Sequence, residues 1–169
     1  MLHRMIACAL AALLVLAVEA VPTPATALPT ADKVVVLKGE RKLLLMKDGS
    51  VLKSYLIALG PNPKGQKRSR GDGRTPEGLY VIDGRDPASY FHRALHISYP
   101  NILDLAQARE KGVPAGGSIL IHGLPPGFGP FRQDEAMMDW TNGCIAVTNT
   151  AMDEIWESVR NGTIIDIRP

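Results

Sequence analysis

Cysteine is scarce in this 169-residue chain, which has only Cys8 and Cys144. Two cysteines exclude a small scaffold held together by several disulfides. Aromatic residues make up only 5% of the chain, which argues against a surface that stacks nucleic-acid bases. The net charge is +2, so the composition gives no reason to expect a nucleic acid as a partner. With 46% hydrophobic and 21% charged residues, the chain has the composition of one globular domain.

A hydrophobic run long enough to span a membrane is also lacking. The apolar run Ile6–Val18 is shorter than the roughly 20 residues that a spanning helix needs. It follows a basic residue and precedes a small-residue cleavage site at Ala25–Ala27, which is the pattern of a secretory leader. We therefore expect residues 1–27 to be a signal peptide, with an earlier cut after Ala20 or an uncleaved anchor as alternatives. The mature protein is predicted in the periplasm or cell envelope, without a stable membrane span.

Removal of the leader would leave Cys144 as the only cysteine of the mature chain. A single thiol is unusual in an exported protein, because such compartments oxidise thiols. Two interpretations follow: Cys144 is a buried, inert side chain, or the thiol is retained for chemistry. The preceding Gly143 allows the backbone to bend closely around the sulfur, which favours a nucleophile.

The pattern of the mature chain predicts a mainly β domain with about two helices. Strands are expected at 33–38, 41–47, 51–59, 79–83, 95–98, 118–122, 143–147 and 163–168, separated by turn signals. Helices are expected at 101–111, with Ile102 and Leu105 on its apolar face, and at 150–160, with a capping box that begins at Thr150. Because the helices do not alternate with the strands, a β-sandwich or partly closed barrel fits better than a parallel α/β sheet.

A loop rich in glycine, proline and charge spans residues 60–78. Its five basic residues are Lys64, Lys67, Arg68, Arg70 and Arg74. One interpretation is a solvated loop, and the other is attraction of an acidic substrate, since long loops inside compact domains are often binding elements.

A cysteine nucleophile needs a base, because a free thiol is mostly protonated at neutral pH. His122 is the strongest candidate, since it ends the apolar segment 118–121 where a strand gives way to a loop. His92 and His96 are four residues apart, but their segment reads as extended and no further ligand completes a metal set. We therefore do not expect a zinc site at these two histidines. His96 is expected to line the site or to make a structural hydrogen bond.

Three sequence elements together resemble the YkuD-type L,D-transpeptidase catalytic domain. They are His122-Gly123, the segment 141–145 (TNGCI), and the segment 75–78 (TPEG) that precedes a strand. The resemblance covers residues 32–168, and the wording DWTNGCIAVTN around the cysteine is similar to one sub-branch of the family.

The resemblance implies an exported enzyme that acts on peptidoglycan stem peptides and needs no metal or organic cofactor. Cys144 would attack a tetrapeptide stem, releasing D-Ala and forming an acyl-enzyme that an amine acceptor resolves. His122 would be the general base, oriented by the carbonyl of Gly123. Backbone N–H groups of Gly143 and Cys144 would hold the oxyanion. The flanking residues Thr141 and Asn142 are expected to contribute to substrate or oxyanion contacts.

The sequence departs from the family pattern at two positions and leaves the acceptor open. Asn142 stands where many members have histidine, and Ala146 stands where many have arginine. Arg132 or a basic residue of the 64–74 loop is expected to take over binding of the substrate carboxylate. Water as acceptor would give an L,D-carboxypeptidase, and an amine on a protein would give a wall-tethering enzyme. A non-catalytic wall-binding module is the alternative from another class.

Overall fold

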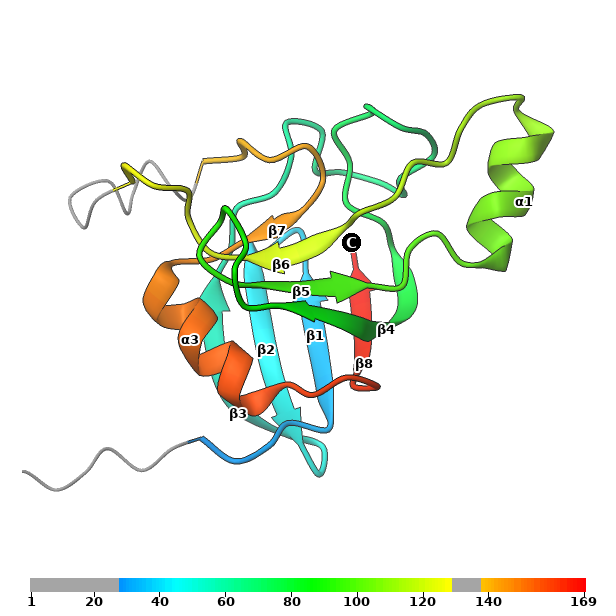
Figure 1. The fold of residues 1–169 in the computed structure, drawn as a ribbon. Helices are drawn as coiled ribbons and strands as arrows, with labels where there is room; N and C mark the ends of the chain where they lie inside the picture. Colours follow the sequence, from blue (N-terminus) through cyan, green and yellow to red (C-terminus); the bar gives the residue numbers. More distant parts are fainter. Residues whose placement is uncertain (1–27, 129–137) are drawn as a thin grey trace, which may run out of the picture.

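The computed structural model describes residues 28–128 and 138–169. Eight strands form one strongly curved sheet in the order β3-β2-β1-β8-β4-β5-β6-β7. They are β1 (Lys33–Leu37), β2 (Lys42–Lys47), β3 (Ser50–Leu56), β4 (Gly78–Asp86), β5 (Ala94–Ile97), β6 (Leu120–His122), β7 (Ile145–Ala146) and β8 (Ile164–Arg168). Two helices, α1 (Ile102–Glu110) and α3 (Asn149–Ser158), lie outside the sheet (Figure 1).

The first three strands form an antiparallel meander, as the turn signals predict. Asp48 and Gly49 both have positive φ, at 48° and 78°, and such a two-residue turn matches the right-handed twist of the strands it joins. The sheet is mixed overall, because β1 runs parallel to β8 and β6 runs parallel to β7.

The curved sheet closes on itself where its two ends meet. Ala58, just beyond β3, and Ala146 in β7 exchange two backbone hydrogen bonds of 2.9 Å. This bridge joins the first and last strands of the sheet order, so the fold is a partly closed barrel. The mainly β fold with two helices is therefore confirmed, in its barrel form.

The core fills the inside of this curved sheet. Its fully buried side chains include Leu43, Leu45, Ile57, Ile82, Leu95, Ile121, Ile145, Met152, Ile155 and Ile165. The helix α3 packs against this core and contributes Met152 and Ile155 to it. Its N-cap is Thr148, whose hydroxyl accepts from the N–H of Ala151. The predicted capping box beginning at Thr150 was therefore wrong by two residues.

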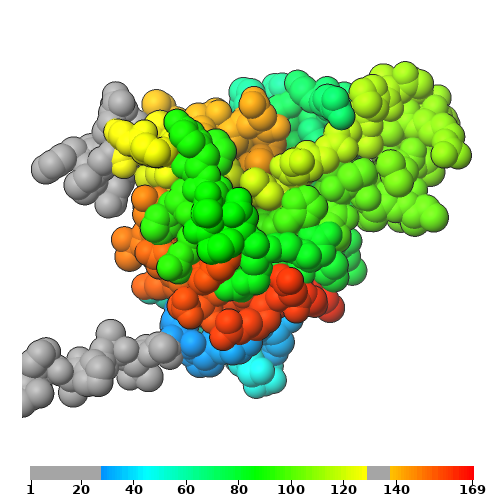
Figure 2. All heavy atoms as spheres, viewed as in Figure 1, coloured from blue at the N-terminus to red at the C-terminus, as the bar shows by residue number. Residues whose placement is uncertain are grey.

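The helix α1 protrudes from the rest of the domain (Figure 2). Its capping box of Asn101 and Asp104 is intact. Ile102 and Leu105, predicted on its packed face, are 81% and 51% exposed. Asp104 is buried instead, because its carboxylate accepts from the Tyr80 hydroxyl at 2.9 Å. The helix is thus attached to the sheet through a polar contact.

Within the described ranges, no helix combines the length and the apolar character needed to cross a lipid bilayer.

Candidate active site

The two predicted catalytic residues belong to neighbouring segments of the sheet: His122 ends β6, and Cys144 directly precedes β7. His122 is the last residue of β6 and pairs with Ala146 in the parallel strand β7. Cys144 immediately precedes β7, so the same register sets it beside Leu120. The parallel pairing of β6 with β7 therefore brings the segments that carry the imidazole and the thiol side by side.

The His122 imidazole is held through its Nδ1 atom. Nδ1 lies 2.7 Å from the carbonyl oxygen of Gly123. A carbonyl only accepts hydrogen bonds, so Nδ1 carries the proton. The neutral ring therefore presents an unprotonated Nε2, which is the form that a general base requires.

The backbone at Gly123 is packed too tightly for a side chain. A Cβ atom there would lie 2.6 Å from Oδ1 of Asn149 and 2.9 Å from the carbonyl oxygen of Phe91. The same Asn149 oxygen accepts from the N–H of Leu124 at 2.7 Å. This packing fixes the carbonyl that orients His122.

An aromatic enclosure surrounds the imidazole, which is only 2% exposed. The Phe91 ring centroid lies 4.4 Å from that of His122, and the Trp140 centroid lies 5.7 Å away. Phe128 stacks on Trp140 at 5.6 Å. Burial lowers the pKa of His122, although the hydrogen bond to Gly123 opposes this. The enclosure thus favours the neutral base at neutral pH.

Cys144 is a free, half-buried cysteine. Its thiol donates to the carbonyl oxygen of Ser118 across an S–O distance of 3.5 Å. Burial raises the pKa of Cys144, against the opposing effects of the Leu120 N–H and the positive charge of Lys67. A thiol with a raised pKa beside a neutral imidazole suits proton transfer during attack, rather than a preformed thiolate–imidazolium pair.

Three hydrogen bonds shape the cysteine loop. Thr141 Oγ1 donates to the carbonyl of Cys144 at 2.8 Å and accepts from the N–H of Gly143 at 3.1 Å. Thr75 Oγ1 donates to the carbonyl of Gly143 at 2.9 Å. Gly143 has φ = 111°, and a Cβ there would lie 2.4 Å from the carbonyl oxygen of Arg74. Glycine is thus required before the cysteine, as expected.

An ion pair anchors the start of the same loop. Asp139 accepts from Arg41 through both carboxylate oxygens, at 3.0 and 2.5 Å. Its Oδ1 also accepts from the N–H of Leu59 at 3.0 Å. These contacts tie the segment before Cys144 to the sheet.

A cavity of about 540 Å³ opens in front of the thiol. It is lined by Lys67, Arg70, Gly71, Gly116, Gly117, Ser118, Ile119, Asn142 and Cys144. One wall thus comes from the basic loop, and the other comes from the segment that leads into β6.

The remaining predicted site residues fall in different places. Asn142 is exposed and lines the cavity. Thr141 shapes the loop rather than facing the cavity, and its hydroxyl occupies the Gly143 N–H that was expected to bind an oxyanion. His96 does not line the cavity but makes a surface contact, with its Nδ1 2.5 Å from the Asp83 carboxylate. Arg132 lies outside the described residues.

Sequence reasoning missed Ser118 as the acceptor of the thiol, because any residue can supply a backbone carbonyl. It also missed the role of Thr75, although the TPEG element drew attention to that position. Among the described residues, no three His, Cys, Asp or Glu side chains cluster to hold a metal ion.

Comparison with known proteins identifies the family of this chain. The profile of the YkuD L,D-transpeptidase catalytic domain matches residues 31–167. The chain belongs to this family. Among curated proteins, it is 30% identical over 135 residues to the putative L,D-transpeptidase YafK of Escherichia coli K12, covering 76% of this chain and 47% of YafK.

Two solved structures share the fold of this L,D-transpeptidase family member. The helical cell shape determining protein Pgp2 of Campylobacter jejuni is 26% identical and has a TM-score of 0.59, over 83% of this chain and 47% of Pgp2. Bd1075 of Bdellovibrio bacteriovorus is 24% identical with a TM-score of 0.55, over 86% of this chain and 53% of Bd1075. The chain therefore spans about half the length of these relatives.

Proposed function

We propose that this protein is an exported peptidoglycan L,D-transpeptidase that works through an acyl-enzyme on Cys144. The observation that carries the proposal is the pairing of β6 with β7. In support, β6 ends at an imidazole whose Nδ1–H is held by Gly123 and whose Nε2 is unprotonated, and Cys144 directly precedes the paired strand β7. Family membership supplies the substrate class, a peptidoglycan stem peptide.

In the first half-reaction, Sγ of Cys144 attacks the carbonyl carbon of the diamino acid in a tetrapeptide stem. The thiol proton passes to Nε2 of His122, and the carbonyl electrons move to oxygen. When the intermediate collapses, the C–N bond to the terminal D-Ala breaks. The imidazolium returns its proton to the leaving amine, which leaves a thioester on Cys144.

Backbone N–H groups would stabilise the tetrahedral oxygen. Because the Gly143 N–H is engaged by Thr141, we assign this role first to the N–H of Cys144. The second half-reaction reverses the chemistry. An acceptor amine attacks the thioester carbonyl, gives a proton to Nε2 of His122, and the C–S bond breaks as the sulfur regains a proton.

Export rests on the sequence pattern of residues 1–27. A peptidoglycan substrate lies outside the cytoplasm, so the leader and the proposed substrate are consistent with each other. A contribution to cell shape is a further element of this proposal, because the similar protein Pgp2 is described as determining helical cell shape.

Product analysis tests the function. The protein and its Cys144→Ala variant are incubated with a purified disaccharide tetrapeptide. The products are separated by chromatography and identified by mass spectrometry. We expect release of D-Ala and a cross-linked dimer with the wild type only. A shortened, hydrolysed stem would identify water as acceptor and an L,D-carboxypeptidase, whereas attachment to an added protein amine would identify a tethering enzyme. No product from the folded wild type would favour a wall-binding module.

A further inference from the structure

The cavity in front of Cys144 has a positively charged wall. Lys67 and Arg70 line it, and both come from the basic loop between β3 and β4. No acidic side chain from the described ranges lines this cavity. Among the same described residues, the cysteine is the one other ionisable side chain in the lining, so the cavity favours a negatively charged ligand.

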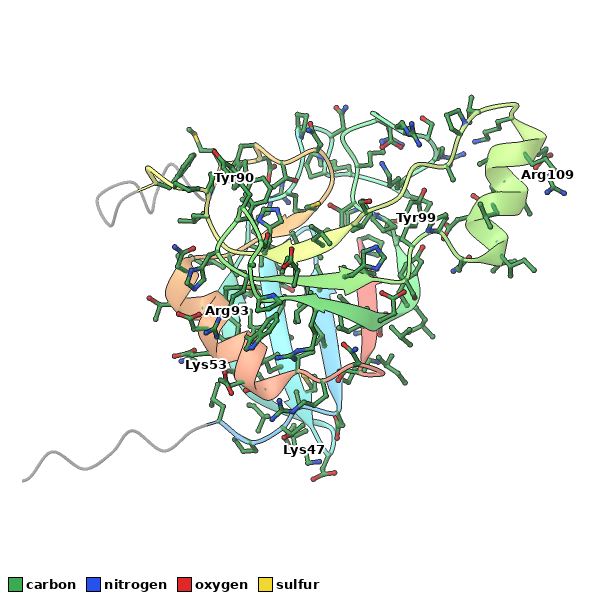
Figure 3. The ribbon with its side chains drawn as sticks, viewed as in Figure 1. Lys47, Lys53, Tyr90, Arg93, Tyr99 and Arg109 are labelled. Carbon is green, nitrogen blue, oxygen red and sulfur yellow. The ribbon has the colours of Figure 1, made fainter. Side chains whose placement is uncertain are left out.

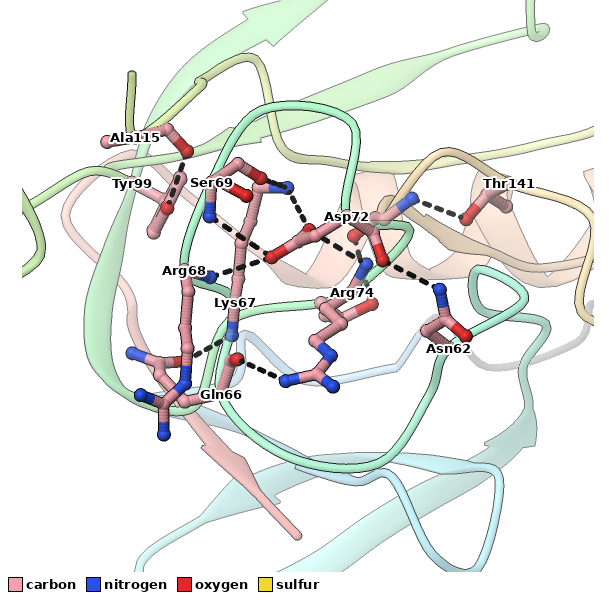
Figure 4. A network of polar contacts seen from close by, with 12 residues as sticks. Asn62, Gln66, Lys67, Arg68, Ser69, Asp72, Arg74, Tyr99, Ala115 and Thr141 are labelled. Carbon is pink, nitrogen blue, oxygen red and sulfur yellow. Dashed lines mark hydrogen bonds and ion pairs between the residues drawn. The ribbon is translucent and has the colours of Figure 1, made fainter. Parts of the chain in front are cut away.

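Asp72 organises this wall from inside the loop. Its carboxylate accepts from the backbone N–H groups of Arg68, Ser69 and Arg74 and from the ammonium of Lys67, at distances of 2.7 to 3.1 Å (Figure 4). Burial alone would raise the pKa of Asp72, but these hydrogen bonds lower it, so the carboxylate stays ionised. The loop is therefore built around one ionised carboxylate.

Lys67 is held at the cavity with donor capacity to spare. Its side chain is nearly buried, with 4% of the residue exposed. The ammonium donates to Asp72 at 2.8 Å and to the carbonyl of Ser69 at 3.1 Å. An ammonium has three N–H donors, so within the described part of the chain one donor is left over.

Arg70 has a fixed backbone and an unengaged guanidinium. Its N–H donates to the carbonyl of Pro114 at 2.8 Å. A Cβ at position 116 would lie 3.2 Å from the Cα of Arg70, so only glycine fits at position 116 without displacing the Arg70 backbone. The side chain is exposed and makes no hydrogen bond or ion pair with the described residues. A guanidinium presented in this way can bind a carboxylate through two parallel hydrogen bonds.

We propose that Lys67 and Arg70 form a carboxylate-binding subsite that selects the donor peptide. The proposal rests on the proposed function for the identity of the donor, and on the cavity alone for the charge of the ligand. Position 146, where the resemblance to the family implies arginine, is a fully buried alanine and does not line the cavity. The basic loop supplies the cations instead.

A chemical probe tests the charge preference without any assumption about the reaction. The probes are iodoacetate, which is a carboxylate, and iodoacetamide, its neutral analogue. The rate of alkylation at Cys144 is read from the mass of the peptide that contains it. We expect the ratio of the iodoacetate rate to the iodoacetamide rate to fall about tenfold in Arg70→Ala, given the strength of hydrogen bonds between charged groups.

Arg68→Ala is the matched control, because Arg68 lies on the same loop but does not line the cavity. This variant should keep the ratio within about twofold of the wild type, since a surface charge outside the site is largely screened. Arg70→Lys should fall between the wild type and Arg70→Ala. An equal ratio in wild type and Arg70→Ala, or an equal loss in Arg68→Ala, overturns the subsite.

Peptide donors then identify which carboxylate is bound. Three tetrapeptides are compared: one unmodified, one amidated at the terminal D-Ala, and one amidated at the side-chain carboxylate of the diamino acid. Arg70→Ala should lower kcat/KM for the unmodified donor and leave it unchanged for the donor whose amide replaces the bound carboxylate. An equal loss with all three donors contradicts selection. If the wild type turns over no donor, the proposed function fails, while the alkylation ratio still decides the subsite.

Discussion

The carbonyl oxygen of Gly123 holds the Nδ1–H of His122 at 2.7 Å. A backbone carbonyl cannot accept a proton from the ring in the way that a carboxylate can, so it orients the imidazole without competing for its charge. The backbone at Gly123 is closely packed, since a Cβ there would lie within 3.0 Å of atoms of Asn149, Phe91 and His92. The neutral ring therefore keeps Nε2 unprotonated, as a general base requires.

The pH dependence of catalysis should reflect the buried imidazole. Burial lowers the pKa of His122, and the neutral form is the active base. The base therefore persists to lower pH than in an ordinary histidine, and the acid limb of kcat/KM should have its midpoint below about 6.5. A pH profile of D-Ala release measures it. A midpoint above that of a free histidine would contradict the role of burial.

Opening the aromatic enclosure should move the same acid limb upward. Phe91→Leu removes the ring 4.4 Å from His122, so water reaches the imidazole and its pKa rises toward the ordinary value. Tyr90→Leu is the control, since Tyr90 lies on the same connection between β4 and β5 (Figure 3), is 69% exposed and contacts Phe91 rather than His122. Equal pH profiles for Phe91→Leu and wild type would show that the ring does not tune the base.

Thr75 should position the cysteine loop through its hydroxyl. Thr75→Val keeps the shape but leaves the Gly143 carbonyl without its 2.9 Å partner, which costs about 1–3 kcal/mol of unfolding free energy. We expect kcat to fall more than KM rises, because the loop that carries Cys144 loses its position. Urea unfolding and steady-state kinetics measure the two effects.

Thr75→Ser is the matched variant, because it keeps the hydroxyl and loses one methyl group. Loss of a buried methyl costs about 0.5–1.5 kcal/mol, so stability should fall modestly while kcat stays near that of the wild type. If Thr75→Ser and Thr75→Val lose kcat equally, packing rather than the hydrogen bond is responsible.

Gly143 should tolerate no side chain. Gly143→Ala places a Cβ 2.4 Å from the Arg74 carbonyl oxygen at a φ of 111°, and strain of this kind costs about 1–3 kcal/mol. Activity should fall sharply, because the shift moves Cys144 directly. Gly39→Ala is the control, since its nearest contact would be an ordinary 3.7 Å. Similar unfolding curves and similar activity for both variants would refute the requirement.

Most strands could be predicted from the sequence because alternating and apolar runs are local signals. The second helix was also predicted, with Met152 and Ile155 in the core as expected. The face of α1 was not, because its attachment depends on the buried carboxylate of Asp104 and on Tyr80, a residue from a distant strand. Periodicity records apolar side chains and carries no information about such a polar contact.

In the candidate site, too, local features could be predicted from the sequence and long-range contacts could not. Cys144 and His122 were selected from residue type and local context, and the parallel pairing of β6 with β7 brings their segments side by side. Their relation to Lys67 and Arg70 depends on how the loop between β3 and β4 folds around Asp72. The sequence shows five basic residues in that loop but does not indicate which of them face the cavity. Only two of the five line the cavity.

Intact-protein mass spectrometry tests the central claim most directly. The protein is mixed with a disaccharide tetrapeptide and quenched in acid at short times. Its intact mass is then measured in parallel with that of Cys144→Ala treated in the same way. The wild type should gain the mass of the stem without its terminal D-Ala, the added mass should map to the peptide that contains Cys144, and the variant should gain nothing. An adduct of equal yield in Cys144→Ala, or product formation that continues in that variant, would contradict a cysteine acyl-enzyme.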